Sequence, residues 1–305
     1  MVRPAFSPPK PAKAHTVRVR WLGACYAVLV VACLISLALQ GDLSFGRNPW
    51  NNLVRTASDF SHPSFLDAWF GPERLEFKAD DGRILRVENR RETERAYLAG
   101  LASATWTTFV IATLGSALAG AFAVPFGLIA ARNAGAPRWL AQPVRLLLNA
   151  CRSVHSLVFG LVLVGIVGLG PVAGILAIAL HSLGTYGKLY AETIESASPQ
   201  LFESGLALGF KPAQVLWFAM RCGFYPQFAS THLYIWEFNV RDSTVLGLIG
   251  AGGLGLLVSE AVSLFQWGRL ATLLLVIVIL VALMDRASAW IRNQLLRTPG
   301  STLAA

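Results

Sequence analysis

The stretch LASATWTTFVIATLGSALAGAFAVPFGLIAA occupies residues 101–131 and contains no charged side chain. A helix needs only about 20 consecutive apolar residues to cross the hydrocarbon core of a bilayer, so this stretch predicts a transmembrane helix. The sequence therefore predicts an all-α integral membrane protein with about six transmembrane helices. The other five apolar stretches lie at residues 21–39, 153–169, 172–190, 228–248 and 270–284.

Composition and charge support this class. Hydrophobic residues make up 54% of the chain and charged residues only 14%, whereas soluble domains carry about 25% charged residues. The formal net charge of +9 would favour nucleic-acid binding in a soluble protein. Here the basic residues lie beside apolar stretches, as at the cytoplasmic ends of membrane helices. We therefore expect a lipid bilayer and no nucleic acid as a partner. The four cysteines form no CxxC pair and predict neither a metal site nor a disulfide.

The flanks of the apolar stretches predict the orientation of the chain. Residues 1–20 contain five basic residues, four prolines and no acid, which predicts a disordered cytoplasmic tail before the first transmembrane helix at 21–39. Residues 286–305 predict a second cytoplasmic tail. Six spans then place both termini in the cytoplasm, in a multi-pass protein of the bacterial inner membrane. The segment between the second and third spans is expected to be an inner loop and carries Arg132, Arg138, Arg145 and Arg152.

Residues 40–100 form the most polar stretch and are predicted to be an extracytoplasmic segment. Between residues 40 and 98, ten acidic residues nearly balance nine basic ones, and long outer loops escape the positive-inside bias. Within the segment, residues 75–87 place apolar side chains around the turn sequence DDGR at 80–83. This pattern is typical of a β-hairpin. The sequence assigns no role to the segment.

Residues 191–226 are too polar to span the membrane and fall on the cytoplasmic side. A helix-start signal at Ser198-Pro199 is followed by ESGLALG at 203–209, which predicts a helix–glycine–helix unit that another protein could grip. The chain has no G-x-x-x-x-G-K-[ST] motif for a nucleotide, since Gly187-Lys188-Leu189 fails at the last position. We therefore expect no cofactor in this chain, and energy would come from a partner or an ion gradient.

Two motifs resemble known transport proteins. Glu203 followed by Gly209 resembles the EAA loop, the coupling helix of binding-protein-dependent ABC importer permeases. The run YIWEFNVRDSTVLGLIGAGGLG at 234–255 resembles the phosphonate permease (PhnE) family, in which a segment close to FEINVRSATVLGLVGAGGIG is typical. Residues 181–195 are similar to the same family just before the loop. The resemblance covers residues 101–284.

This resemblance implies a type I ABC importer permease domain at residues 101–285, and a function. The chain would carry phosphonate or a related phosphorus oxyanion such as phosphite into the cytoplasm, and would not itself be an enzyme. The implied partners are a second copy in a homodimer, a cytoplasmic ABC ATPase dimer that binds the ATP, and an extracytoplasmic phosphonate- or phosphite-binding protein. The implied ATPase-coupling residues are Glu203, Gly209 and Lys211.

Polar side chains in the fifth span are the candidates for the substrate path. Ionisable residues at membrane depth are costly and usually face a cavity or a partner. Glu237 and Arg241 are spaced i, i+4 and share a helix face, so they form either a structural ion pair at a subunit interface or part of the path. A guanidinium offers an oxyanion two parallel donors. The candidates are Glu237, Asn239, Arg241, Ser243 and Thr244.

The glycine-rich run after this span has two interpretations. Backbone amides in such a run can bind anions, but in membrane proteins glycines more often permit close packing or a break in a helix. We favour packing or a break, and a gate or hinge is compatible with both. The glycines concerned are Gly250, Gly252, Gly253 and Gly255. His155 and His181 lack metal-ligand spacing and are interpreted as hydrogen-bonded packing residues.

Other functions stay open at this point. A secondary transporter or channel often shows inverted repeats around broken helices, and we find no convincing repeat. A membrane enzyme would carry a catalytic motif such as H-E-x-x-H or G-x-S-x-G, and the spans contain none. The nearest alternative is a binding-protein-dependent permease for another small solute, such as methionine or another oxyanion.

Overall fold

The structure is a computed structural model that describes residues 13–39, 48–72, 75–78, 84–196, 207–210, 215 and 225–296. The chain forms two units, residues 1–57 and 58–305, and each is described by itself. Helices make up nearly all of the regular structure. Among the described residues the one sheet is a two-stranded hairpin, so the predicted all-α class is confirmed.

The first unit contains the apolar helix α1 (Lys13–Leu39) and most of α2 (Pro49–Phe60). The side chains of α1 from Trp21 to Ser36 are exposed throughout, and this part of the helix is apolar. An apolar helix exposed on all sides is suited to lipid. The predicted disordered tail at 1–20 is wrong in part, because α1 already begins at Lys13, beyond the last proline of that tail. Residues 1–12 lie outside the described residues.

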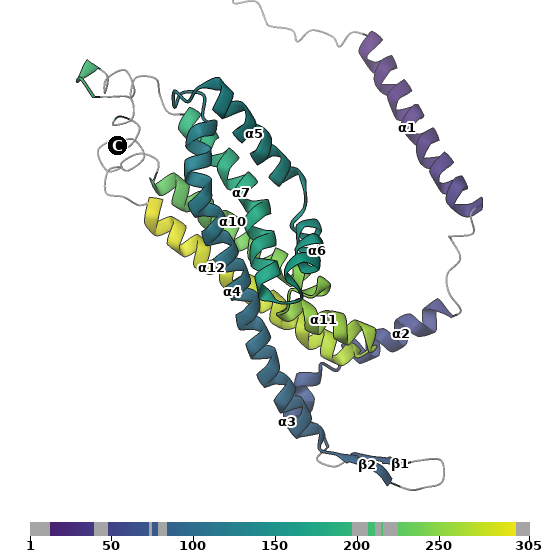
Figure 1. Cartoon of the computed structure of the whole chain (residues 1–305). Helices are drawn as coiled ribbons and strands as arrows, with labels where there is room; N and C mark the ends of the chain where they lie inside the picture. Colours follow the sequence, from purple (N-terminus) through teal and green to yellow (C-terminus); the bar gives the residue numbers. More distant parts are fainter. Residues whose placement is uncertain are drawn as a thin grey trace, which may run out of the picture. The chain divides into compact units, whose positions relative to one another are not determined.

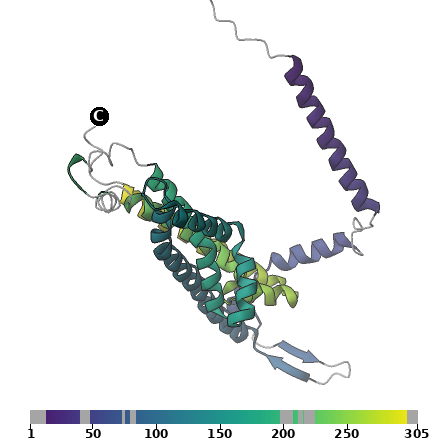
Figure 2. The same cartoon turned by 45° about the horizontal axis from the view of Figure 1, so that its top comes forward.

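The second unit is built around two long helices, α4 (Arg90–Ala130) and α7 (Pro171–Glu195), which lie side by side (Figures 1 and 2). Glycines permit this approach. A Cβ added to Gly115 would lie 2.8 Å from Ile178, and one added to Gly174 would lie 3.1 Å from Ile111. In lipid, helices associate through such close packing rather than through the hydrophobic effect. Both helices also carry small buried residues: Ala112, Ala119 and Ala123 on α4, and Ala173 and Ala177 on α7.

Helix α4 begins at Arg90, well before the predicted start of its span at 101. Asn89 is the N-cap, and its side chain accepts a hydrogen bond from the Glu92 backbone N–H at 3.4 Å. The acidic Glu92 also lies in the first turn, where the helix dipole favours negative charge. Helix α4 therefore runs through the predicted boundary between an outer segment at 40–100 and the permease domain at 101.

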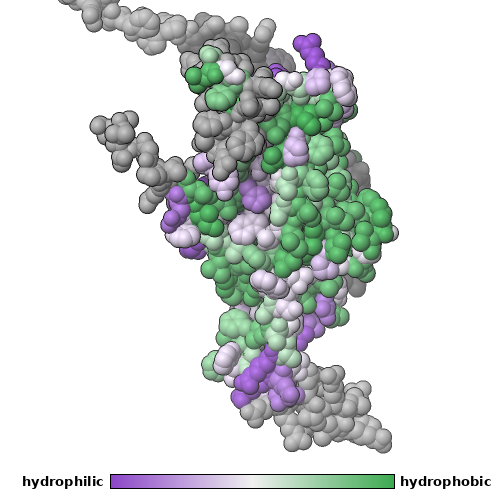
Figure 3. All heavy atoms as spheres, turned by 60° about the vertical axis from the view of Figure 1, so that its left-hand side comes forward, coloured by the Kyte–Doolittle hydropathy of each residue, from purple (hydrophilic) through white to green (hydrophobic). Residues whose placement is uncertain are grey.

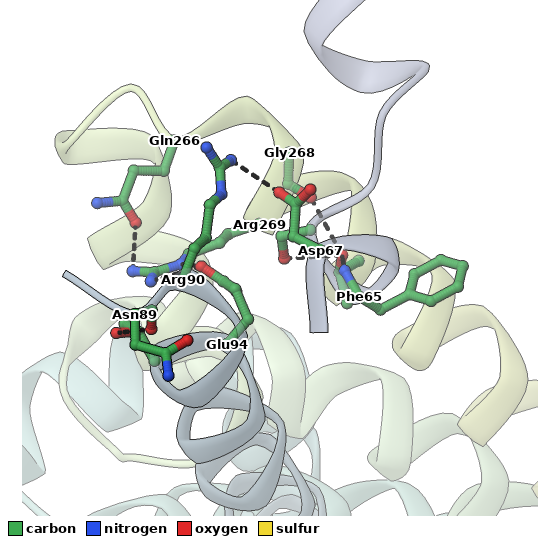
Figure 4. Close-up of polar contacts among 11 residues, drawn as sticks. Phe65, Asp67, Asn89, Arg90, Glu94, Gln266, Gly268 and Arg269 are labelled. Atoms are coloured by element: carbon green, nitrogen blue, oxygen red, sulfur yellow. Dashed lines mark hydrogen bonds and ion pairs between the residues drawn. The ribbon is translucent and has the colours of Figure 1, made fainter. Parts of the chain in front are cut away.

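Residues 58–72 pack against the beginnings of α4 and α12 (Trp267–Leu296) through η1 (Ser64–Leu66) and α3 (Asp67–Phe70). Ser64 Oγ lies 3.1 Å from Thr272 Oγ1, and Asp67 forms a 2.7 Å ion pair with Arg90. Helices α4 and α12 are joined by a buried ion pair, in which Glu94 of α4 accepts two hydrogen bonds from Arg269 of α12 at 2.8 and 3.2 Å (Figure 4). Part of the polar outer segment is thus bonded to the helical bundle.

The hairpin predicted at residues 75–87 is confirmed. Strand β1 (Leu75–Lys78) pairs antiparallel with β2 (Ile84–Glu88), with Leu75 opposite Glu88 and Phe77 opposite Arg86. The register shifts between Phe77 and Lys78. The turn sequence at 80–83 lies outside the described residues.

The third predicted span, at 153–169, is instead a pair of helices bent by 92°, α5 (Arg138–Ser153) and α6 (Ser156–Val167). The segment expected to be an inner loop before it is largely helical, because residues 138–153 form α5. Its apolar residues recur at helical spacing and bury one face: Ala141, Val144, Leu148 and Cys151. The face lies on α7, where a Cβ at Gly184 would stand 2.5 Å from the backbone of Leu148 and Arg152.

The fifth span is also broken. Helix α10 (Tyr225–Leu246) continues into η3 (Gly247–Ile249) and then α11 (Leu254–Ser263), with a bend of 46°. Helix α12 extends beyond the predicted span at 270–284, so the tail expected at 286–305 is helical as far as Leu296. In α12 the helical run continues because residues 285–296 include no glycine or proline.

Three helices, α4, α7 and α12, are long and apolar enough to cross a membrane on their own. The bent pairs α5–α6 and α10–α11 raise the number to five if each is one span, and Trp21–Ser36 in α1 is a shorter apolar helix. These segments coincide with the six predicted spans.

Candidate functional site

Arg241 lies in the middle of the broken span and is the centre of a charged network. Its Nη2 donates to Glu237 Oε1 at 2.8 Å and to Asp285 Oδ1 of α12 at 2.9 Å. Arg292, also on α12, lies 3.7 Å from Glu237 Oε2. Two cations and two carboxylates therefore stand together, with a formal charge of zero. The pairing of Glu237 with Arg241 follows from their spacing, but no local pattern pointed to Asp285 or Arg292.

The network faces outward from the chain. The Arg241 and Asp285 side chains are 47% and 43% exposed, while Glu237 is 16% exposed. Nη2 makes both contacts, so the Nε and Nη1 donors have no partner among the residues that the structure describes. In the view of Figure 3 the described surface of the bundle is mostly hydrophobic, with a few hydrophilic side chains among the hydrophobic ones.

Large apolar side chains continue this exposed face of α10. Tyr234, Phe238, Val245 and Leu248 are exposed and recur at intervals of three and four residues with Arg241 among them. Positions three and four apart lie on one side of a helix. Arg241 is therefore the charged group in the middle of an apolar stripe.

Asn239 and Ser243 lie on another face of α10 and are fully buried. Asn239 Nδ2 donates to Ser116 of α4 at 2.8 Å, and Ser182 of α7 donates to Asn239 Oδ1 at 3.0 Å. Ser243 donates to the backbone carbonyl of Thr108 at 3.2 Å. Arg241 and Ser243 were both candidates for the substrate path, but they do not converge, because Ser243 points into the bundle. Thr244 donates to the Arg241 carbonyl at 2.6 Å.

A second polar group lies where α5 meets α6. Ser156 donates a short hydrogen bond to the buried Asp242, and His155 Nε2 lies 3.7 Å from the same carboxylate. His155 also caps α6, since its Nδ1 accepts from the Leu157 N–H at 3.2 Å. His181 bonds the Val154 carbonyl at 2.8 Å, as expected of a packing residue. The 92° bend between the two helices is held by these contacts.

No group of three or more His, Cys, Asp or Glu side chains suited to a metal occurs in the part of the chain that the structure describes.

The glycine-rich run produces a break in the helix. Gly250, Gly252 and Gly253 have positive φ angles of 95°, 85° and 70°, which non-glycine residues rarely adopt. Gly255 lies against Gly247, where an added Cβ would stand 2.7 Å from the Gly247 Cα. The Leu254 N–H donates to Thr108 Oγ1 at 2.8 Å, so this amide is already paired within the protein. Close packing and a helix break, which we favoured from the sequence, are what the structure contains.

The residues proposed to couple to an ATPase are only partly described. Gly209 adopts a positive φ of 83°, and no atom of the described residues lies within 4 Å of an added Cβ, which suits the predicted helix–glycine–helix turn. Glu203 and Lys211 lie outside the described residues.

Comparison with known proteins links these features to one family. Residues 123–297 match the family described as binding-protein-dependent transport system inner membrane component. The chain is 40% identical over 186 residues to the phosphite transport system permease protein PtxC of Stutzerimonas stutzeri, covering 61% of this chain and 68% of the relative. It is 33% identical to the phosphate-import permease protein PhnE of Mycolicibacterium smegmatis, covering 64% of this chain and 37% of that protein.

A solved structure has the same fold. The inward-facing MetNI methionine ABC transporter superimposes with a TM-score of 0.54 at 20% identity, over 64% of this chain and 95% of the other. The similarity to importer permeases therefore includes the arrangement of the helices as well as the sequence motifs. A type I importer permease fold and a multi-pass protein of the inner membrane follow from these comparisons.

Proposed function

Because the chain belongs to the family of binding-protein-dependent transport system inner membrane components, we propose that it is the permease subunit of an ATP-driven importer for phosphonate or a related phosphorus oxyanion such as phosphite. Relatives named for phosphite transport, at 37–40% identity, support this substrate class. The observation that carries the proposal is the Arg241 guanidinium, exposed within a membrane span with donors to spare. A permease catalyses no covalent step. Its function is to let the anion cross the membrane, here along a path that passes the Arg241 guanidinium.

The charge of Arg241 explains why its face would line the path. An arginine exposed to hydrocarbon is expensive, and intramembrane charges normally face a cavity or a partner. We therefore place a second copy of the chain opposite this face, in a homodimer with the path between the copies. Glu237 and Asp285 hold the guanidinium in place, and the Nε and Nη1 donors are available to an oxyanion. A formally neutral network would hold the anion weakly enough to release it.

Coupling to ATP is assigned to a cytoplasmic ABC ATPase dimer, which binds the nucleotide. Members of this family work with an ATPase and a solute-binding protein. We propose that the ATPase engages the segment with Glu203, Gly209 and Lys211, and that an extracytoplasmic binding protein delivers the anion. When ATP closes the ATPases, the segment would move and the spans would alternate access. The break between α10 and α11 offers a hinge beside Arg241.

The orientation follows from charge. The segment from the end of α4 through α5 carries Arg132, Arg138, Arg145 and Arg152 and no acidic residue, and cytoplasmic ends of spans carry such an excess of basic residues. We assign this end of the bundle, and both termini, to the cytoplasm.

The experiment that tests the function is uptake of labelled methylphosphonate and phosphite by cells with and without this gene. Deletion should abolish uptake of at least one anion, and the intact gene should restore it. A Glu203→Ala variant should reach the membrane but fail to restore uptake or to retain the ATPase. Unchanged uptake of both anions on deletion would contradict the substrate class, and normal ATPase retention by Glu203→Ala would contradict the coupling segment.

A further inference from the structure

A polar cavity of about 280 Å³ lies at the end of the bundle where α4 and α7 terminate. It is bordered by the last turn of α4, the middle of α5 and the last turns of α7. Three basic side chains face two carboxylates there, which leaves a formal charge of +1. The charged and amide side chains of the lining are Arg132, Arg145, Asn149, Lys188, Glu192 and Glu195.

The carboxylates of this cavity are already engaged. Glu195 Oε1 accepts a hydrogen bond from the Arg132 backbone N–H at 2.8 Å, and Glu192 forms a 3.6 Å ion pair with Lys188. Arg145 donates through Nε to the Ala130 carbonyl at 2.7 Å, which fixes its guanidinium at the cavity. Within the described ranges, the two terminal nitrogens of Arg145 and the guanidinium of Arg132 have no partner. With Lys188 paired to Glu192 and Arg132 and Arg145 set against the one carboxylate of Glu195, one net positive charge and several guanidinium N–H donors remain for a ligand.

The surroundings of the cavity are those of a membrane surface. Ala130 is the last residue of the apolar helix α4, so the cavity stands at the end of a span. On α5, Leu146 and Leu147 flank Arg145 and are 71% and 45% exposed, and Trp139 is 77% exposed. Tryptophan at the end of a span commonly marks the interface between hydrocarbon and headgroups. Apolar side chains thus stand beside the cationic cavity on the same helix.

We propose that this cavity binds a phosphate group, supplied by an anionic phospholipid headgroup or by a free phosphorus oxyanion. Guanidinium groups match the oxygens of phosphate with paired donors, and basic pockets between membrane helices bind anionic headgroups. The site is separate from the Arg241 network, which lies on α10 and α12. Its occupation would tie α4, α5 and α7 together at their shared end, and it can be tested without transport.

The test measures binding to the purified full chain in detergent of neutral headgroup. Native mass spectrometry would follow retention of phosphatidylglycerol, with phosphatidylcholine as reference, in the wild type, in R132Q/R145Q and in the matched control R138Q. Arg138 is exposed, lies on α5 like Arg145, and is outside the cavity lining. Retention should fall roughly fivefold for each cavity arginine removed and stay unchanged in R138Q.

A second arm adds millimolar inorganic phosphate to distinguish the two sources. Phosphatidylglycerol that phosphate does not displace assigns the site to lipid, whereas displacement that depends on the two arginines assigns it to a free oxyanion. Equal binding of both probes by the wild type and R132Q/R145Q would overturn the proposal, as would equal loss in R138Q. If the double variant does not purify, R132Q alone decides, because the Arg132 guanidinium forms no hydrogen bond or ion pair with the described residues.

Discussion

Around α10, side chains only two residues apart serve different purposes. Glu237 and Arg241 share the exposed face, while Asn239 is buried against Ser116 and Ser182. Residues three or four apart share a face of a helix and those two apart do not. The exposed pair therefore belongs to the candidate path, and the buried amide belongs to the packing of α10 on α4 and α7.

Replacing Asn239 should destabilise the fold. Asn239→Ala removes the amide that bonds the buried Ser116 and Ser182 hydroxyls, which should lower the free energy of unfolding by about 1–2 kcal/mol. Thermal denaturation of the detergent-solubilised protein would measure the change. Thr107→Ala is the control, since that exposed hydroxyl bonds only its own helix at Ser103. Equal melting temperatures for Asn239→Ala and the wild type would contradict the assigned role.

The ion pair between Glu94 and Arg269 should contribute more to the free energy of unfolding than the pair between Asp67 and Arg90. Arg269→Met strands the buried carboxylate of Glu94 and should cost about 3 kcal/mol. Arg90→Met breaks a pair whose side chains are 47% and 32% exposed and should cost less than about 1 kcal/mol. Denaturation of the two variants side by side compares them. A larger loss of unfolding free energy for Arg90→Met than for Arg269→Met would contradict the greater contribution assigned to the buried pair between α4 and α12.

At the scale of elements, two of the apolar spans are broken by a bend, one between α5 and α6 and one between α10 and α11. Glycines with positive φ separate α10 from α11, and His155, Ser156 and Asp242 hold the bend between α5 and α6. Broken helices at the middle of a membrane are tolerated where the freed backbone is covered by protein or faces a cavity. The breaks are therefore where the proposed path and its hinge would lie.

The break after α10 should not tolerate side chains. A methyl group at Gly255 would overlap the Thr244 carbonyl and stand 2.7 Å from the Gly247 Cα, so Gly255→Ala should force α10 and α11 apart and abolish uptake. Gly100→Ala in α4 is the control, because no atom lies within 4 Å of an added Cβ there and alanine favours a helix. Uptake assays on equal amounts of membrane-inserted protein would compare them. Normal uptake by Gly255→Ala would contradict a rigid requirement for the break.

For the whole molecule, features that depend on one segment could be predicted from the sequence, whereas contacts between distant segments could not. The six apolar stretches were predicted because composition alone marks a span. Helix α5 was mistaken for a loop, since its buried residues alternate with arginines and its mean hydropathy is low. Asp285 and Arg292 were missed as partners of Arg241 and Glu237 because they belong to a distant helix. Ser243 was predicted to face the substrate path but packs against α4. The sequence of α10 alone does not show which of its faces α4 covers.

The most direct measurement is phosphite and methylphosphonate uptake by cells carrying Arg241→Gln, compared with the wild type and Arg286→Gln. Arg286 lies beside Asp285 on α12, and its one described contact is with a backbone carbonyl of its own helix. We predict that Arg241→Gln still reaches the membrane and retains the ATPase but loses uptake by at least tenfold, while Arg286→Gln transports normally. Uptake by Arg241→Gln equal to that of the wild type would contradict the assignment of this face to the path.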